Sequence, residues 1–196
     1  MQSSSVRAII DNKKTQTRRL VKGLSPDMPQ GKYQYRGVQH GIHALELLDD
    51  DGDPTEEFFP CSKPQYFPNE AVYVKEAYGY ALVSGGCLYK ADYATERMAP
   101  PLSTGDKWRS ALFMPESLAR VFLKITDLRV EYLRDISVED VLSEGIRTAH
   151  GSFANALNRE AYFDLFYRIN TEVEVKSNPL VWVYSFVRVS KPGCAA

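Results

Sequence analysis

The chain has 196 residues, 44% of them hydrophobic, and its 24 basic and 25 acidic side chains leave a net charge of -1. This length fits one domain with a sizeable core, and the balanced charge excludes a whole-protein basic field, so any contact with nucleic acid must come from a local patch. The sequence has three cysteines but no C-x-x-C pair, and it has neither an apolar run near the ~20 residues of a membrane span nor a signal-peptide core. These features predict a cytoplasmic protein that does not contact a membrane.

The first third of the chain predicts a helix, a strand and a long insertion. Serine hydroxyls near the start can cap a helix, and the apolar residues after them recur at helical spacing up to Asn12. A strand is predicted through Leu20 and Val21. Residues 23–68 have weak periodicity and many Gly, Pro and acidic residues, so we interpret them as an excursion from the core fold. A hairpin or a short helix is expected inside it, because an unstructured loop of this length is unusual.

Strand patterns dominate from residue 71 onward. Residues 71–80 and 87–93 are predicted as partner strands, because a Gly-Gly pair separates two alternating runs. A short strand is predicted over 108–113. The clearest alternation covers 119–132, with a bulge expected at positions 126 and 127, where the alternation changes phase.

Two helices and a closing strand follow. Ser137 with Asp140 three positions later is a variant of the capping box, and Gly145 is expected to end that helix. A second helix is predicted over 158–169, with Tyr162 on its apolar stripe. Residues 180–189 are apolar on both faces, which predicts a central strand covered on each side.

The order of these elements defines the expected fold class. Strands outnumber helices and lack regular βα alternation, which favours an α+β fold: a small mixed β-barrel flanked by helices. We expect a single domain over residues 1–190, with the insertion at 23–68 inside it and a tail at 191–196.

A cationic cluster follows the first helix. Four of the seven residues 13–19 are Lys or Arg and two are Thr, and together these donors suit phosphate oxygens. The same cations also fit a solvated helix end, where they offset the helix dipole. Lys14 and Thr17 can cooperate only if a turn puts them on one face. Thr17 would then be a nucleophile with Lys14 as its base, aided by the neighbouring cations Arg18 and Arg19. The Lys14 side chain is expected to lie outside the core.

Other candidate residues lie far from this cluster in the sequence. Glu144 ends a capped helix where the dipole disfavours a carboxylate, so it is either functional or a tolerated surface residue. Glu76 is predicted to face the core, which favours a structural ion pair with Arg109 or Arg19 over a catalytic acid. Trp108 beside Arg109 can stack on and bind a base, or Trp108 can pack in the core.

Metal and cofactor motifs are incomplete. The acidic residues 49–51 before Gly52 do not fit the register of a calcium loop, and His40, His43 and Cys61 form only a partial zinc set. No phosphate-binding or dinucleotide-binding glycine motif is present. We therefore expect neither a metal nor a cofactor.

Several motifs resemble a known family. Residues 14–19, with the sequence K-T-Q-T-R-R after a short helix, resemble the K-T-x-T-x-R segment of ASCH domains, which are PUA-like barrels. The order and spacing of further segments resemble a larger, phage-associated branch of that family: Val72-Tyr73-Val74-Lys75-Glu76, Trp108-Arg109-Ser110 with Met114-Pro115, residues 136–146, and Asn178-Pro179 before Val181-Trp182-Val183. The resemblance covers nearly the whole chain, apart from residues 23–60 and the tail after 190.

This resemblance implies a cleft that recognises RNA, a nucleotide or a modified nucleoside. Some small members resemble amidohydrolases that remove the acyl group of N4-acetylcytidine with a Lys, a Thr and a Glu, which fall here on the catalytic candidates Lys14, Thr17 and Glu144. The chain departs from these hydrolases by its insertion and by Arg18. The substrate-binding candidates are Arg18, Arg19, Glu76, Trp108 and Arg109. Alternatives are ribonuclease-like RNA processing, and a phage accessory protein that binds a host protein through residues 23–68.

Overall fold

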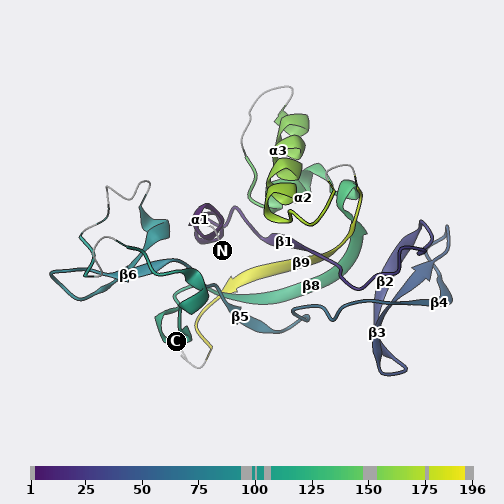
Figure 1. The fold of residues 1–196 in the computed structure, drawn as a ribbon, viewed down its shortest axis with the longest axis horizontal. Coiled ribbons are helices and arrows are strands. Elements are labelled where there is room, and N and C mark those ends of the chain that lie inside the picture. The colour runs from purple at the N-terminus through teal and green to yellow at the C-terminus, as the bar shows by residue number, and fades with distance from the viewer. Residues whose placement is uncertain are drawn as a thin grey trace.

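The centre of the protein is a curled antiparallel sheet that closes about half of a barrel (Figure 1). Its strands run in the order β1 (Gln16–Leu20), β9 (Leu180–Val189), β8 (Phe122–Tyr132) and β5 (Ala71–Tyr73). The computed structural model describes residues 3–93, 99, 101–103, 107–147, 154–174 and 177–192. The expected mixed α+β class is confirmed at this level. The last four residues of the expected tail lie outside the described residues.

Strand β9 is covered on both faces, as its sequence predicts. Trp182 and Tyr184 belong to the larger core cluster on one face, whereas Val181 and Val183 belong to a second cluster on the other. All four side chains are at most 2% exposed, because neighbouring strands flank β9 and apolar layers cover it above and below. The register of β8 against β9 shifts between Ile125 and Asp127, which confirms the predicted bulge.

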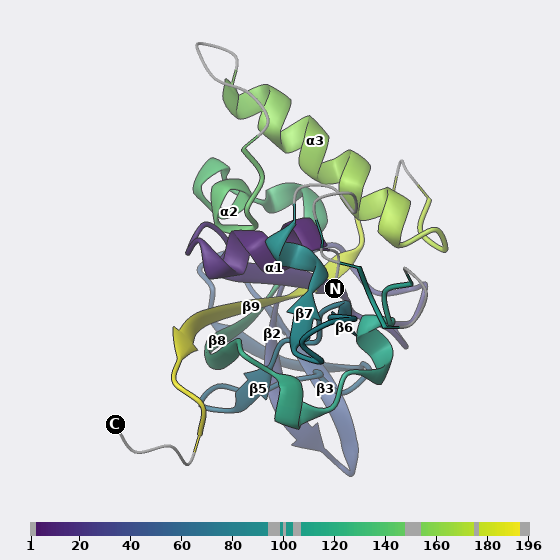
Figure 2. The same ribbon diagram turned by 90° about the vertical axis from the view of Figure 1, so that its left-hand side faces the viewer.

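Three helices lie on one side of the sheet (Figure 2). They are α1 (Ser3–Ile10), α2 (Val138–Ser143) and α3 (Ala154–Ile169), which begins four residues earlier than predicted. Val141 of α2 and Phe166 of α3 pack in the second cluster with Val183, so these two helices cover that face of β9. No helix in the described part of the chain is long and apolar enough to cross a bilayer.

The predicted insertion contains a three-stranded antiparallel sheet formed by β2 (Lys32–Gln39), β3 (Ile42–Leu48) and β4 (Pro54–Pro60). The hairpin alternative is thus confirmed for this segment and the helix alternative is wrong. His40 and Gly41 join β2 to β3 with positive φ values of 51° and 83°, as a tight hairpin turn requires. One face of this sheet packs into the larger core, where the Tyr35 ring meets Trp182 edge-on at 5.3 Å.

Two predicted strands differ in the structure. The expected strand over 71–80 is split into β5 and β6 (Tyr78–Tyr80), and β6 pairs with β7 (Cys87–Tyr89) rather than with the main sheet. The expected strand over 108–113 is only a bridge between Arg109 and Tyr78, followed by a short 3-10 turn over Ala111–Phe113. The Ser110 hydroxyl accepts a hydrogen bond from the Leu112 amide at the start of that turn, and this local capping replaces extended pairing.

Candidate functional site

Lys14 and Glu144, which are 130 residues apart, meet beside the end of α2. The chain leaves α1 in a turn in which the Lys13 and Lys14 amides both donate to the Ala8 carbonyl, at 2.7 and 3.0 Å. Lys14 then forms an antiparallel bridge with Glu144, and the Thr15 amide donates to the Ser143 carbonyl at 2.7 Å. The turn that the sequence analysis required after the first helix therefore exists.

The Lys14 ammonium and the Glu144 carboxylate form a buried ion pair. The ammonium donates to Oε2 of Glu144, and it donates to the Glu144 carbonyl oxygen at 3.0 Å. The two side chains are only 7% and 6% exposed. The expectation that the Lys14 side chain lies outside the core is therefore wrong. Two charges removed from water need good mutual geometry and further hydrogen bonds, and Glu144 has a second cation beside it.

Gly145 allows this close approach. It follows α2 with a φ of +85°, which confirms the predicted helix stop, and a Cβ at this position would lie 3.1 Å from Cβ of both Ala8 and Lys14. Any larger residue would therefore combine a strained backbone with a steric conflict. The glycine after Glu144 is thus needed both for the end of α2 and for the space that Lys14 occupies.

Arg18 holds the Glu144 carboxylate from the other side. Its guanidinium contacts three carboxylates: Glu144 through Nη1 at 3.3 Å, Glu131 through Nε at 2.8 Å and Asp140 through Nη2 at 2.8 Å. Burial lowers the pKa of Arg18, but Glu131 and Glu144 outweigh this effect, so the pKa is raised and the charge is retained. The Arg18 side chain is fully buried and its guanidinium is bound by these carboxylates, although the residue borders the cavity described below. In this arrangement Arg18 holds the Glu144 carboxylate in place.

Every cation of the network around this site is paired with carboxylates. Arg129 donates to Asp140 at 2.8 Å and to Glu131 at 3.2 Å, so both carboxylates are shared between two arginines. Asp140 stands in the first turn of α2, where its amide donates to the predicted N-cap, Ser137, at 3.0 Å. Arg129 also pairs with Asp127 at 3.7 Å. The network thus joins three cations to four carboxylates: Lys14, Arg18 and Arg129 with Asp127, Glu131, Asp140 and Glu144. Such a cluster has no surplus cation for a phosphate.

A cavity of about 380 Å³ opens beside the Lys14–Glu144 pair. This volume falls at the lower end of the range for small-molecule sites, which is about 300–1,000 Å³. Its wall combines the charged pair with apolar and aromatic side chains of α3, including Tyr162, Leu165 and Phe166. Polar groups at one end and apolar groups at the other are the usual composition of a site for a small, largely uncharged ligand.

Thr17 and Arg19 belong mainly to the opposite face of β1. In the register with β9, Arg18 pairs with Val183 of the helix-covered core, whereas Thr17 pairs with Tyr184 of the other core. Because side chains alternate along a strand, the Thr17 hydroxyl points away from the face that holds Arg18. Thr17 still borders the cavity, but within the described chain no hydrogen bond joins its hydroxyl to Lys14 or Glu144. The expected cluster of amine, hydroxyl and carboxylate is therefore only partly assembled.

A second hollow, of about 550 Å³, lies on that opposite face. Thr17, Arg19 and Lys75 line it together with the tyrosines Tyr66, Tyr73 and Tyr184. Arg19 and Lys75 are exposed, and no Asp or Glu is among the described residues that form its wall. We call this hollow the tyrosine groove.

The remaining predicted site residues lie elsewhere. Glu76 is completely buried, and Arg120 binds both of its oxygens at 2.9 Å, so the structural ion pair is confirmed but its predicted partners were wrong. Trp108 packs against Tyr93 with ring centroids 6.0 Å apart, and the Arg109 guanidinium lies 5.5 Å from the Tyr80 ring. The structure does not bring Glu76, Trp108 or Arg109 into the walls of the cavity or the tyrosine groove.

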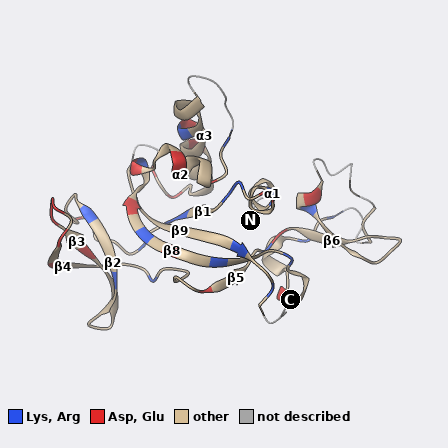
Figure 3. Cartoon of the chain, turned by 180° about the vertical axis from the view of Figure 1, so that it is seen from behind, with Lys and Arg blue, Asp and Glu red and all other residues tan. Residues whose placement is uncertain are grey.

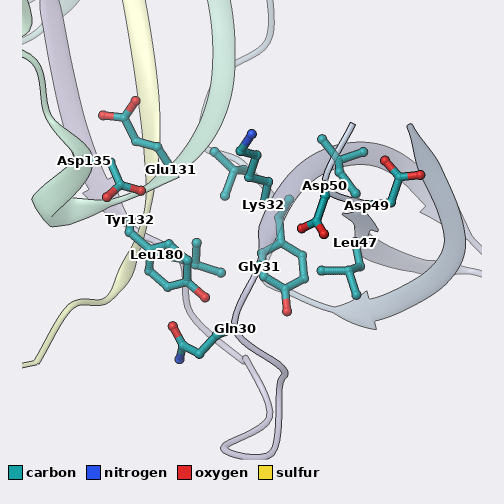
Figure 4. A pocket seen from close by; sticks show the side chains of 13 residues that line it. Gln30, Gly31, Lys32, Leu47, Asp49, Asp50, Glu131, Tyr132, Asp135 and Leu180 are labelled. Atoms are coloured by element: carbon teal, nitrogen blue, oxygen red, sulfur yellow. The ribbon is translucent and has the colours of Figure 1, made fainter. Parts of the chain in front are cut away.

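A third hollow, of about 840 Å³, lies between the inserted sheet and the end of the main sheet (Figure 4). Asp49 and Asp50 on one side and Asp135 on the other line it, with Lys32 as its one lining cation among the described residues. Figure 3 shows red segments on β3 and β4 of the insertion, with blue segments on β2 and along the main sheet. This acidic hollow does not suit a phosphate.

Sequence reasoning missed four residues of the site: Glu131, Asp140 and Arg129, which complete the charge network, and Tyr162, which lines the cavity. Tyr162 matched the apolar stripe of a helix, and only its hydroxyl distinguished it from the phenylalanines beside it.

The fold and the site define an α+β protein with a curled antiparallel sheet and a buried Lys–Glu pair at the wall of a small cavity. Comparisons with family models, curated proteins and solved structures found no match to this chain.

Proposed function

We propose that this chain is an ASCH-type protein of the PUA-like superfamily that hydrolyses an acyl group from a modified nucleoside bound in the Lys14–Glu144 cleft. The observation that carries the proposal is the buried ion pair of Lys14 and Glu144 at the wall of a cavity of about 380 Å³. An amine and a carboxylate in contact can pass a proton between water, substrate and leaving group. The cations of the network are all paired with carboxylates, which favours a nucleoside over a polyanion.

The proposed reaction is hydrolysis of an amide. A water molecule attacks the acyl carbon, with Glu144 accepting one of its protons, and the bond between carbon and the exocyclic nitrogen breaks. The Lys14–Glu144 pair returns that proton to the departing nitrogen, so the products are a carboxylic acid and the free amine of the base. Water replaces Thr17 as the nucleophile in this scheme, because alternation along β1 directs the Thr17 hydroxyl to the other face.

The test uses N4-acetylcytidine and the purified full chain, with products identified by mass. The wild type should release cytidine and acetate, and Lys14→Met should lower kcat/KM by about 10²-fold or more, the usual contribution of a proton-transfer group. Lys13→Met is the matched control, since Lys13 is the adjacent lysine but its side chain is 56% exposed. Circular dichroism of each variant checks the fold, because Lys14 is buried. A wild type that neither binds nor cleaves this nucleoside would refute the proposal.

The tyrosine groove supports a second candidate function, recognition of single-stranded RNA. Exposed Arg19 and Lys75 can contact phosphates, and the rings of Tyr66 and Tyr73 can stack on bases. Titration of a short single-stranded RNA should give an affinity that falls with salt, and Arg19→Ala should reduce that dependence by about one phosphate contact. Lys32→Ala, in the acidic hollow, should leave both quantities unchanged. An affinity that does not depend on salt would contradict this function.

A host-protein partner for residues 23–68, a phage origin and a cytoplasmic location stay predictions.

A further inference from the structure

The hydroxyl of Tyr162 is a buried polar group without a partner. Tyr162 is 4% exposed, and its hydroxyl oxygen makes no hydrogen bond to any described residue. More than about 90% of buried polar groups in proteins are hydrogen-bonded, so an exception calls for a functional reason or a bound molecule. Tyr167, one turn further along α3, follows the general rule, since its hydroxyl donates to the Ser177 carbonyl at 2.8 Å.

The position of this hydroxyl relates it to the cleft. Tyr162 is in the cavity wall together with Lys14, Arg18 and Glu144. Lys14 and Arg18 each bind one oxygen of Glu144, and no hydrogen bond joins the Tyr162 hydroxyl to that carboxylate. The hydroxyl therefore stands beside the reactive pair with its hydrogen-bonding capacity unused.

The chemistry of its surroundings makes this hydroxyl a donor. Burial, and then the charge of Glu144, raise the pKa of Tyr162 well above its ordinary value, and the opposing effect of Arg18 is smaller. The phenol therefore keeps its proton throughout the physiological range. A neutral phenol that donates beside this charged pair is suited to a neutral oxygen acceptor such as a carbonyl.

We propose that Tyr162 is a further catalytic residue of this cleft, whose hydroxyl donates a hydrogen bond to the acyl carbonyl oxygen of the bound nucleoside. This inference rests on the proposed hydrolysis. When water adds to the acyl carbon, the carbonyl oxygen becomes an oxyanion, and a donor fixed in a dry site stabilises that state more than it stabilises the ground state. Hydrogen bonds of catalytic groups are often incomplete before substrate binds and align in the complex.

Tyr162→Phe isolates the hydroxyl, because it keeps the ring in the core. With N4-acetylcytidine we expect kcat to fall by about 10²- to 10³-fold, as on removal of one oxyanion donor, while KM changes by less than about tenfold. The midpoint of urea unfolding should stay unchanged or rise, because a hydroxyl without a partner has been removed. Tyr167→Phe should show the opposite pattern, with unchanged kcat and a lower midpoint, since its hydroxyl has a partner.

The outcomes separate the two proposals. If the wild type cleaves the nucleoside and Tyr162→Phe cleaves it equally fast, the role of Tyr162 is refuted and the hydrolase assignment stands. If the unfolding midpoint of Tyr162→Phe drops as far as that of Tyr167→Phe, the hydroxyl has a structural partner and the inference is also refuted. If the wild type neither binds nor cleaves N4-acetylcytidine, both proposals are refuted together.

Discussion

Replacing Arg18 with methionine should destabilise the protein strongly at neutral pH. Arg18 is fully buried and is the common partner of Glu131, Asp140 and Glu144. Removing one member of a buried ion pair typically costs about 3–5 kcal/mol, because the remaining charge stays buried without compensation. Lys14 still pairs with Glu144, and Arg129 still pairs with Glu131 and Asp140, so the variant keeps a partial compensation of its buried carboxylates. We therefore expect a loss near the lower limit, about 3 kcal/mol.

The penalty should also depend on pH with a definite sign. Without Arg18, buried carboxylates outnumber the remaining cations of the network, so protonation of one of them should relieve the folded variant more than it relieves the wild type. A carboxyl with a raised pKa contributes its stability below the unfolded value and loses it as pH rises through the folded value. The difference in stability between wild type and Arg18→Met should therefore shrink from pH 7 toward pH 4.

Urea unfolding at pH 7 and pH 4.5, followed by the fluorescence of buried Trp182, measures both effects. Arg19→Met is the matched control, because Arg19 is adjacent in sequence but exposed and without a carboxylate partner among the described ion pairs. It should change stability by less than about 0.5 kcal/mol. A penalty below about 1 kcal/mol for Arg18→Met, or one that does not change with pH, would show that Arg18 does not hold the carboxylates as described.

Three further predictions concern other parts of the structure. Gly145→Ala should lower the free energy of unfolding in urea by about 1 kcal/mol more than Gly41→Ala does. Both glycines have positive φ, but only an alanine at 145 would also meet neighbouring side chains at 3.1 Å. Equal losses of stability in the two variants would contradict the close approach. Arg120→Met should lower the free energy of unfolding by about 3–5 kcal/mol, because it leaves Glu76 buried and unpaired. At a temperature where the variant is folded its kcat should be unchanged, since neither residue lines the cleft. Burial raises the pKa of Cys61 to about 11, so the wild type should lose stability as the pH rises from 9 to 11. Cys61→Ala should lose less stability over the same pH range, as measured by urea unfolding at each pH.

The elements that local pattern defines were predictable from the sequence. Strand β9 is apolar on both faces and is central, and the bulge in β8 falls where the alternation changes phase. The inserted sheet was harder to see, because its register shifts twice: between Tyr35 and Val38 on β2, and between Glu46 and Leu48 on β3. Each shift breaks the two-residue period on which strand prediction depends. The His40–Gly41 pair, with alternating residues on each side, is the signal that could have revealed the first hairpin.

The partners within the site depend on long-range register and could not be read from sequence spacing. Glu76 was expected to need a cation, and it has one, but the choice of Arg120 depends on how the segment before β8 lies against the segment after β5. The meeting of Lys14 with Glu144 was expected only from a family resemblance, supported by the position of a carboxylate at a helix end. Arg18 was interpreted as a phosphate ligand because the sequence shows that it is charged but does not show that its side chain is buried.

The alternation of β1 divides the cationic segment between two sites rather than one. Arg18 is buried with Glu144, whereas Thr17 and Arg19 border both the cavity and the tyrosine groove. Read as a continuous cluster, these residues predict one phosphate site with several cations. Read along a strand, they place Arg18 in the ion-pair network on one face and direct Thr17 and Arg19 toward the tyrosine groove on the other. A small substrate in the cavity and a strand of RNA in the groove would therefore share only Thr17 and Arg19, which line both hollows. Substitutions at Arg18 and at Arg19 should affect different measurements for this reason, although the two residues are adjacent.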